Sequence, residues 1–84
     1  MNDFDNFFEA MKKKFEKKKA SHGESWRKVS LISLRHRVRE EYEEWYTATN
    51  EQVEMEKLIN LASQCMLLWI RLREKYNILK TLRA

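Results

Sequence analysis

Residues 55–79 have the sequence MEKLINLASQCMLLWIRLREKYNIL, and this stretch decides the fold. Apolar side chains recur in it at alternating steps of three and four residues, which predicts one long helix over residues 50–82. The members of this stripe are Met55, Leu58, Ala62, Cys65, Trp69, Leu72, Tyr76 and Leu79. The same spacing is typical of coiled coils, and we expect that arrangement after residue 70 rather than before it.

A second apolar set extends the apolar surface around almost the whole circumference of this helix between residues 58 and 70. Its members are Ile59, Leu61, Met66, Leu67, Leu68 and Ile70. A helix of this kind must be covered on several sides. Two shorter helices from the same chain are too few to cover it fully. We therefore expect a homodimer with this helix at the interface.

The composition predicts the rest of the architecture. Proline is absent, and the 84 residues include one glycine, Gly23. This argues against a sheet with tight turns and favours a few long helices. We predict one all-α domain over residues 1–84, a small bundle of three helices completed by dimerisation. The expected order is a helix over 3–20, a linker over 21–29, a helix over 30–48 and the long helix over 50–82.

The first helix is amphipathic, with an aromatic stripe on one side and lysines on the other. The stripe consists of Phe4, Phe7, Phe8, Met11 and Phe15. We expect the stripe to be part of the core and the lysines within residues 12–19 to form a solvated face. The alternative is that one of these lysines contacts a polyphosphate.

The linker contains the sequence Ser25-Trp26-Arg27-Lys28, which follows the helix-ending glycine after one intervening residue, Glu24. Gly23 can end a helix because it tolerates a left-handed conformation. An aromatic ring beside two cations can stack on a base and bind phosphates. Trp26 can equally be a hinge residue packed on the core, and the residues alone leave both interpretations open.

Four carboxylates lie within residues 40–44 of the second helix, for which Ser30 is the expected N-cap. At 100° per residue, Glu41 lies roughly 60° and Glu44 about 120° from the centre of the apolar stripe, with the other two nearly opposite. The stripe consists of Leu31, Leu34, Val38, Tyr42 and Trp45. Glu41 and Glu44 are therefore the two that need a partner.

Two kinds of partner are open for these carboxylates. Arg37 lies at the same edge of the helix and could pair with them directly. A divalent cation held by oxygen ligands is the other candidate. The spacing alone favours an ion-pair network over a metal site.

The third helix begins after Thr49-Asn50-Glu51-Gln52, where the threonine and the glutamine predict a capping box. Its apolar middle contains few polar side chains, and these face whatever polar feature the second helix presents. They are Lys57, Asn60, Ser63 and Gln64.

Charge and cysteine content limit the location and the partners. The formal net charge is +4, with much of the basic character in residues 12–14 and 17–19. This fits an anionic ligand, nucleic acid or plain solubility. Cys65 is the single cysteine, so no disulfide framework is expected and a reducing, cytoplasmic setting fits. We expect no signal peptide and no membrane span, because no basic segment precedes an apolar run and no uncharged segment reaches the roughly 20 residues that a bilayer requires.

Several motifs together resemble the MazG-like all-α nucleoside triphosphate pyrophosphohydrolases over about residues 20–72. They are the pairs His22-Gly23 and Ser25-Trp26, the paired glutamates, and residues 56–68, EKLINLASQCMLL. In that family a Glu-Glu-x-x-Glu motif faces a Glu-x-x-Asp motif, and the carboxylates bind Mg²⁺. Glu40, Glu41 and Glu44 match the first motif. Lys57 and Asn60 replace the acids of the second.

The resemblance implies hydrolysis of a nucleoside triphosphate to the monophosphate and pyrophosphate, with Mg²⁺ or Mn²⁺. It implies Glu41 and Glu44 as catalytic residues. It also implies a metal set of Glu40, Glu41, Glu44 and Asn60, and substrate contacts from Trp26, Arg27, Lys28 and Lys57. The replacements lower the local negative charge, and Lys57 could take the cation's place by pairing with Glu41 or Glu44.

The alternative is a non-catalytic dimeric helical binding protein that retains only the fold. Its partner would be a nucleotide, a protein or nucleic acid. A nucleic-acid role would rest on the lysine clusters and on Arg35, Arg37 and Arg39. It is disfavoured because the sequence contains no helix-turn-helix signature and no platform of interleaved aromatic and basic residues.

Overall fold

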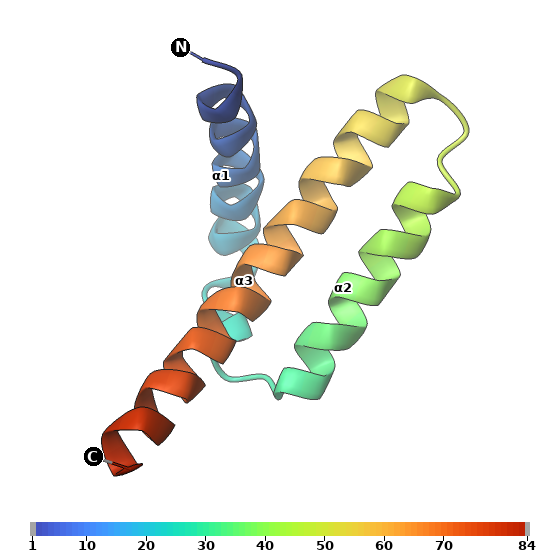
Figure 1. The fold of residues 1–84 in the computed structure, drawn as a ribbon. Coiled ribbons are helices and arrows are strands. Elements are labelled where there is room, and N and C mark those ends of the chain that lie inside the picture. The colour runs from blue at the N-terminus through green and yellow to red at the C-terminus, as the bar shows by residue number, and fades with distance from the viewer. Residues whose placement is uncertain (1, 84) are drawn as a thin grey trace.

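The computed structural model describes the backbone of residues 2–83 and the side chains of residues 2–20 and 23–82. This part contains three α-helices, α1 (Asp3–His22), α2 (Leu31–Tyr46) and α3 (Glu51–Arg83), a short 3-10 turn, η1 (Ser25–Arg27), and no strand. The predicted all-α bundle is confirmed. Figure 1 shows α2 running antiparallel beside the N-terminal half of α3, with α1 on the other side of α3.

The helix ends follow from local hydrogen bonds. The side chain of Ser30 accepts from the backbone N–H of Ser33 at 3.1 Å, so the predicted N-cap of α2 is confirmed. Gly23 ends α1 with a φ of 63°, a region that favours glycine. The predicted capping box at Thr49 is wrong, because Asn50 caps α3 by accepting from Val53 N–H at 2.9 Å.

The core lies where η1, α2 and α3 meet. Trp26, Leu34 and Leu67 are buried there. Half-buried apolar side chains pack against them, namely Phe15, Val29, Leu31, Met66, Leu68 and Ile70. Four members of the second apolar set on α3 are therefore in or against the core, which is the side that α1, η1 and α2 cover.

The aromatic stripe of α1 departs from its prediction. Phe4, Phe7 and Phe8 are exposed rather than core residues, and only Phe15 reaches the core, with its ring centre 6.2 Å from that of Trp26 in an edge-to-face arrangement. The geometry explains the difference. The C-terminal end of α1 meets α3, whereas the N-terminal end of α1 points away from the bundle (Figure 1).

Within residues 2–83, none of the helices combines the length and the apolar character that a membrane span needs.

Candidate functional site

The loop between α1 and α2 is fixed to α3 by Arg71. Its guanidinium Nη1 donates to the carbonyl oxygen of Trp26 at 2.8 Å and to that of Val29 at 2.7 Å. The Trp26 carbonyl belongs to the short η1 turn and the Val29 carbonyl to the loop after it, and neither lies in an α-helix, where the backbone supplies a partner. Arg71 therefore holds Trp26 in place from the opposite helix.

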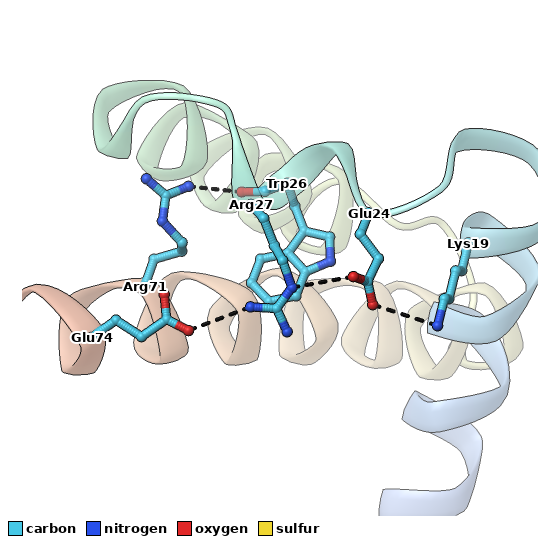
Figure 2. Close-up of polar contacts among 6 residues, drawn as sticks. All are labelled: Lys19, Glu24, Trp26, Arg27, Arg71 and Glu74. Atoms are coloured by element: carbon cyan, nitrogen blue, oxygen red, sulfur yellow. Dashed lines mark hydrogen bonds and ion pairs between the residues drawn. The ribbon is translucent and has the colours of Figure 1, made fainter.

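A chain of ion pairs runs across the same loop and passes Trp26 (Figure 2). Lys19 pairs with Glu24 at 3.4 Å, and Arg27 contacts Glu24 at 3.3 Å and Glu74 at 3.4 Å. The Arg27 guanidinium also lies 4.3 Å from the Trp26 ring centre. Each exposed pair stabilises little by itself. Together they connect α1, η1 and α3 beside the Trp26 ring.

Next to this network a pocket of about 550 Å³ opens between α1, the loop, α2 and α3. Its volume lies in the range of small-molecule sites. Apolar, cationic and acidic side chains line it together. They include Phe15, Trp26 and Leu67, then Lys18, Lys19 and Arg37, then Glu40, Glu41 and Gln64.

Three polar atoms of the pocket lining are buried and lack a hydrogen-bond partner: Trp26 Nε1, Gln64 Oε1 and Glu41 Oε2. Trp26 is 5% exposed and Gln64 is 7% exposed, so bulk water does not satisfy these atoms. Buried polar groups in native proteins are nearly always hydrogen-bonded, and an unpaired one costs free energy. As the structure stands these atoms are also closed to a ligand, because an atom that water cannot reach is out of reach of another molecule's polar atoms.

The electrostatics of Glu41 agree with its half-buried position. Burial raises the pKa of Glu41 above its ordinary value, and the negative charge of Glu44 raises it further. The positive charges of Lys18 and Lys57 act in the opposite direction and do not cancel these effects. The charged form of Glu41 is thus disfavoured mainly by burial, and a side-chain hydrogen bond with Glu44 also raises its pKa.

Glu44 has a different partner. Lys57 Nζ donates to Glu44 Oε2 at 3.2 Å, so the ion pair that the sequence suggested is present. The neighbouring Asn60 Oδ1 is buried and unpaired. An ammonium group beside Glu44 stands in the place that a divalent cation would need, and an amide oxygen at Asn60 supplies no negative charge. These residues do not fit a magnesium site. Among the described residues, no group of three or more His, Cys, Asp or Glu side chains could hold a metal ion.

The predicted site residues therefore divide into two neighbouring groups. The pocket brings Trp26, Glu40 and Glu41 together, whereas Glu44, Lys57 and Asn60 do not line it. Arg27 also lies outside the pocket lining and packs on Trp26, and Lys28 is an exposed residue at the end of η1. Glu43, which lies nearly opposite the apolar stripe of α2, contacts Arg39 at 3.4 Å on the surface. The side chain of His22, part of the resemblance, lies outside the described residues.

Two residues of the site had no role assigned from the sequence. Gln64 was recognised as a polar residue in an apolar helix, and Arg71 was not singled out. Together with Leu67 they follow the spacing of three and four that places side chains on one helix face. The available signal was therefore an apolar residue, Leu67, with the polar residues Gln64 and Arg71 on the same helix face. This arrangement indicates a polar contact with the loop.

No family model, curated protein or solved structure matches this chain. The resemblance to the MazG-like pyrophosphohydrolases therefore stays a prediction. The fold and the pocket are described from the chain's own residues, and any functional conclusion must rest on them.

Proposed function

We propose that this chain is a non-catalytic helical binding protein that works as a homodimer and holds a nucleotide in the pocket beside Trp26. The observation that carries the proposal is the ion pair between Lys57 and Glu44 at 3.2 Å. A lysine in that position neutralises a carboxylate that metal-dependent hydrolysis would need for a cation. The pocket remains as a binding site that does not depend on a metal.

The exposed area supports a second copy of the chain. The surface of 6864 Å² exceeds the roughly 5,400 Å² expected for a compact protein of 10.3 kDa. The excess of about 1,500 Å² is larger than the roughly 800 Å² that each partner contributes to a stable interface. One chain thus exposes more than enough surface for a homodimer.

The heptad stripe of α3 is the surface we assign to that dimer. Trp69 is 59% exposed and Tyr76 is 65% exposed. Leu72, between these two residues in the sequence, and Leu79, after them, are exposed as well. Their spacing of three and four aligns them on one face of the helix. In Figure 1 the C-terminal part of α3 extends past the end of α2, so neither α1 nor α2 covers it there. A two-fold axis would pair this face with itself.

The cytoplasmic location that we propose rests on Cys65. Cys65 is a free cysteine on the stripe; it is exposed in the single chain, and the partial burial that its neighbours cause raises the pKa of the thiol. A thiol with a raised pKa reacts slowly, as expected for a packing residue rather than a redox group. This fits the cytoplasmic location that we propose.

A metal titration tests the non-catalytic proposal. We expect wild-type protein to bind neither Mg²⁺ nor Mn²⁺ in isothermal titration calorimetry, and the double variant Lys57→Glu, Asn60→Asp to bind at least one of them. The variant restores two carboxylates opposite Glu41 and Glu44, which hard cations prefer. Equal metal binding by the two proteins would contradict the proposal.

A second candidate function is metal-dependent hydrolysis of nucleoside triphosphates. The observation that favours it is the half-buried position of Glu41 beside Glu44: burial raises the pKa of Glu41 most, the negative charge of Glu44 raises it further, and a bound cation would oppose both effects. The test is release of pyrophosphate from a panel of nucleoside triphosphates with Mg²⁺ or Mn²⁺. Turnover that is lost in Glu41→Gln would establish this candidate in place of the first.

A further inference from the structure

A second hollow, away from the pocket beside Trp26, lies between α2 and α3. It is a groove of about 480 Å³ with an apolar floor that includes Val38, Leu61 and Leu68. At 100° per residue, the α2 residues that line the groove and those that line the pocket are centred roughly 150° apart. None of the α1 residues whose side chains the structure describes lines the groove. The chain's own first helix therefore leaves it open.

The N-terminal half of α1 exposes a face that its own chain does not cover. Phe4 is 85% exposed, and Phe7 and Phe8 are about half exposed. This end of α1 points away from the bundle (Figure 1). Aromatic rings gain much from burial against another surface. The molecule thus carries an open apolar groove and, elsewhere, an uncovered aromatic helix face.

The spacing of the aromatic face fits a groove between two helices. Its members occupy positions i, i+3, i+4 and i+7 of α1, which is the pattern by which a helix anchors in an apolar groove. They are Phe4, Phe7, Phe8 and Met11. Leu61 and Leu68 on the groove floor are also seven residues apart. At a rise of 1.5 Å per residue, face and floor each extend over about 10 Å.

The charges favour this helix as the occupant. Residues 3–11 contain acidic side chains and no lysine or arginine. Asp5 and Glu9 are exposed and lie four residues apart beside the aromatic face. Arg35 and Arg39, which also line the groove, have the same spacing on α2. Opposite charges arranged at one spacing select a partner and fix its register.

These charged groups have few partners within one chain. In the part of the chain that the structure describes, the side chains of Asp5, Glu9 and Arg35 form no ion pair. Arg39 forms one, at the surface, with a side chain that is 77% exposed. Such a pair contributes little to stability, so a second carboxylate can join or replace it.

We infer that residues 3–11 of α1 dock into the α2–α3 groove of a second copy of the chain, with the aromatic face in the groove and the acidic edge beside Arg35 and Arg39. A two-fold axis forms this contact twice, because each copy carries both surfaces. Cys65 lines the groove and belongs to the α3 stripe, so the two contacts adjoin. The inference rests on the homodimer of the proposed function and names a second surface for it.

Removal of two rings tests the apolar part of the contact. In Phe4→Ala with Phe8→Ala, we expect the dimer dissociation constant to rise at least about tenfold in sedimentation velocity, because buried aromatic anchors dominate interfaces. Both rings are exposed in the single chain and Phe15 still packs against the core, so the fold is retained, which circular dichroism checks. Ile32→Ala is the control, because Ile32 is exposed and lines no part of the groove.

Charge reversal tests which surfaces meet. One chain carries Asp5→Lys with Glu9→Lys, and the other carries Arg35→Glu with Arg39→Glu. Each homodimer then brings like charges together, and we expect each to dissociate at least about tenfold more readily than wild type. In a mixture, one groove pairs lysine with glutamate and the other keeps the native pairing. The heterodimer should therefore form about as tightly as the wild-type dimer.

A matched control separates this pairing from net charge. Glu16→Lys with Glu56→Lys changes the charge by the same amount at two exposed positions outside residues 3–11 and outside the groove. Mixed with the arginine variant, this chain should not favour a heterodimer.

The outcomes separate the contact from the homodimer itself. A dimeric wild-type chain whose phenylalanine variant dimerises equally well would overturn the docking of α1 and leave the α3 stripe as the interface. A charge-reversed mixture that associates no better than its separate chains would overturn the pairing with Arg35 and Arg39. Assemblies larger than a dimer would overturn the two-fold arrangement. A wild-type chain that stays monomeric would overturn both this inference and the proposed homodimer.

Discussion

Two faces of α3 carry opposite kinds of side chain. The face toward the loop and α2 contains the polar residues Ser63 and Gln64, both buried, together with Leu67. The face away from them carries Trp69 and Tyr76, which are large, largely apolar and exposed. Polar residues are thus inside and aromatic residues outside, the reverse of the usual distribution.

The difference indicates two separate tasks for one helix. A pocket lined by Gln64 and Leu67 points to a ligand, and an aligned apolar stripe points to another protein surface. The first face contains the unpaired oxygen of Gln64, and the second has the heptad spacing. In this account the covered face binds a nucleotide and the exposed face binds a second copy of the chain.

The largest expected effect comes from a substitution on the exposed face of α3. In Leu72→Glu, the new carboxylate would face its own copy across the two-fold axis and lose its hydration, so we expect the dimer dissociation constant to rise at least about a hundredfold. Sedimentation velocity over a range of concentrations measures it. The control is Ile32→Glu on α2, another exposed apolar position. A wild-type chain that is monomeric throughout would contradict the assignment of this face.

The sequence predicted the helices well and the covered face of α3 less well. Ser30 and Gly23 mark helix ends through hydrogen bonds or φ values that depend on neighbouring residues alone, so they could be recognised locally. The exposure of Phe4, Phe7 and Phe8 depends on the direction in which α1 leaves the bundle, and no local pattern encodes this direction. The same limit applies to α3. The sequence showed two apolar sets on this helix, but it did not show which of them α1 and α2 cover.

The next largest effect concerns the covered face. Arg71→Met removes two hydrogen bonds from the carbonyls of Trp26 and Val29 while it retains much of the aliphatic volume. We expect the free energy of unfolding to fall by about 2 to 3 kcal/mol, because charge-assisted hydrogen bonds are lost and two acceptors are left unpaired. Urea denaturation measures this change.

The matched control for Arg71 is Arg39→Met. Arg39 makes one exposed contact with Glu43 at 3.4 Å, so its loss should change stability by less than about 1 kcal/mol. Equal effects of the two substitutions would show that Arg71 does not fix the loop as described.

The candidate site was predicted only in part for a physical reason. Helical phase placed Glu41 at the edge of the core, and the structure gives it a half-buried position and a raised pKa. Lys57 was expected to pair with Glu41 or Glu44, because it lies where the resemblance expects an acid, and the structure pairs it with Glu44. The pocket itself was not foreseen, since Lys18, Trp26 and Gln64 come from three segments whose meeting depends on tertiary packing.

The smallest expected effect is on the pH dependence of stability. The folded state raises the pKa of Glu41, so it binds this proton more tightly than the unfolded chain does. The Glu41 contribution to stability is therefore fully present below the unfolded value of about 4.5 and is lost as pH rises through the folded pKa. We expect wild-type protein to lose stability relative to Glu41→Gln between pH 4 and neutral pH, as measured by urea midpoints. A parallel pH profile for the two proteins would contradict this role of burial.

The three tryptophans allow one measurement of both faces at once. Trp26 reports on the pocket and Trp69 on the exposed stripe, and Trp45, whose indole N–H is bonded to Glu54, serves as an internal reference. In an amide and indole ¹H–¹⁵N correlation spectrum, we predict that a nucleoside monophosphate shifts the indole signal of Trp26 alone and that dilution shifts that of Trp69 alone. A Trp26 signal that does not respond to the nucleotide, or a Trp69 signal that moves together with it, would contradict the division of α3 into a nucleotide face and a dimer face.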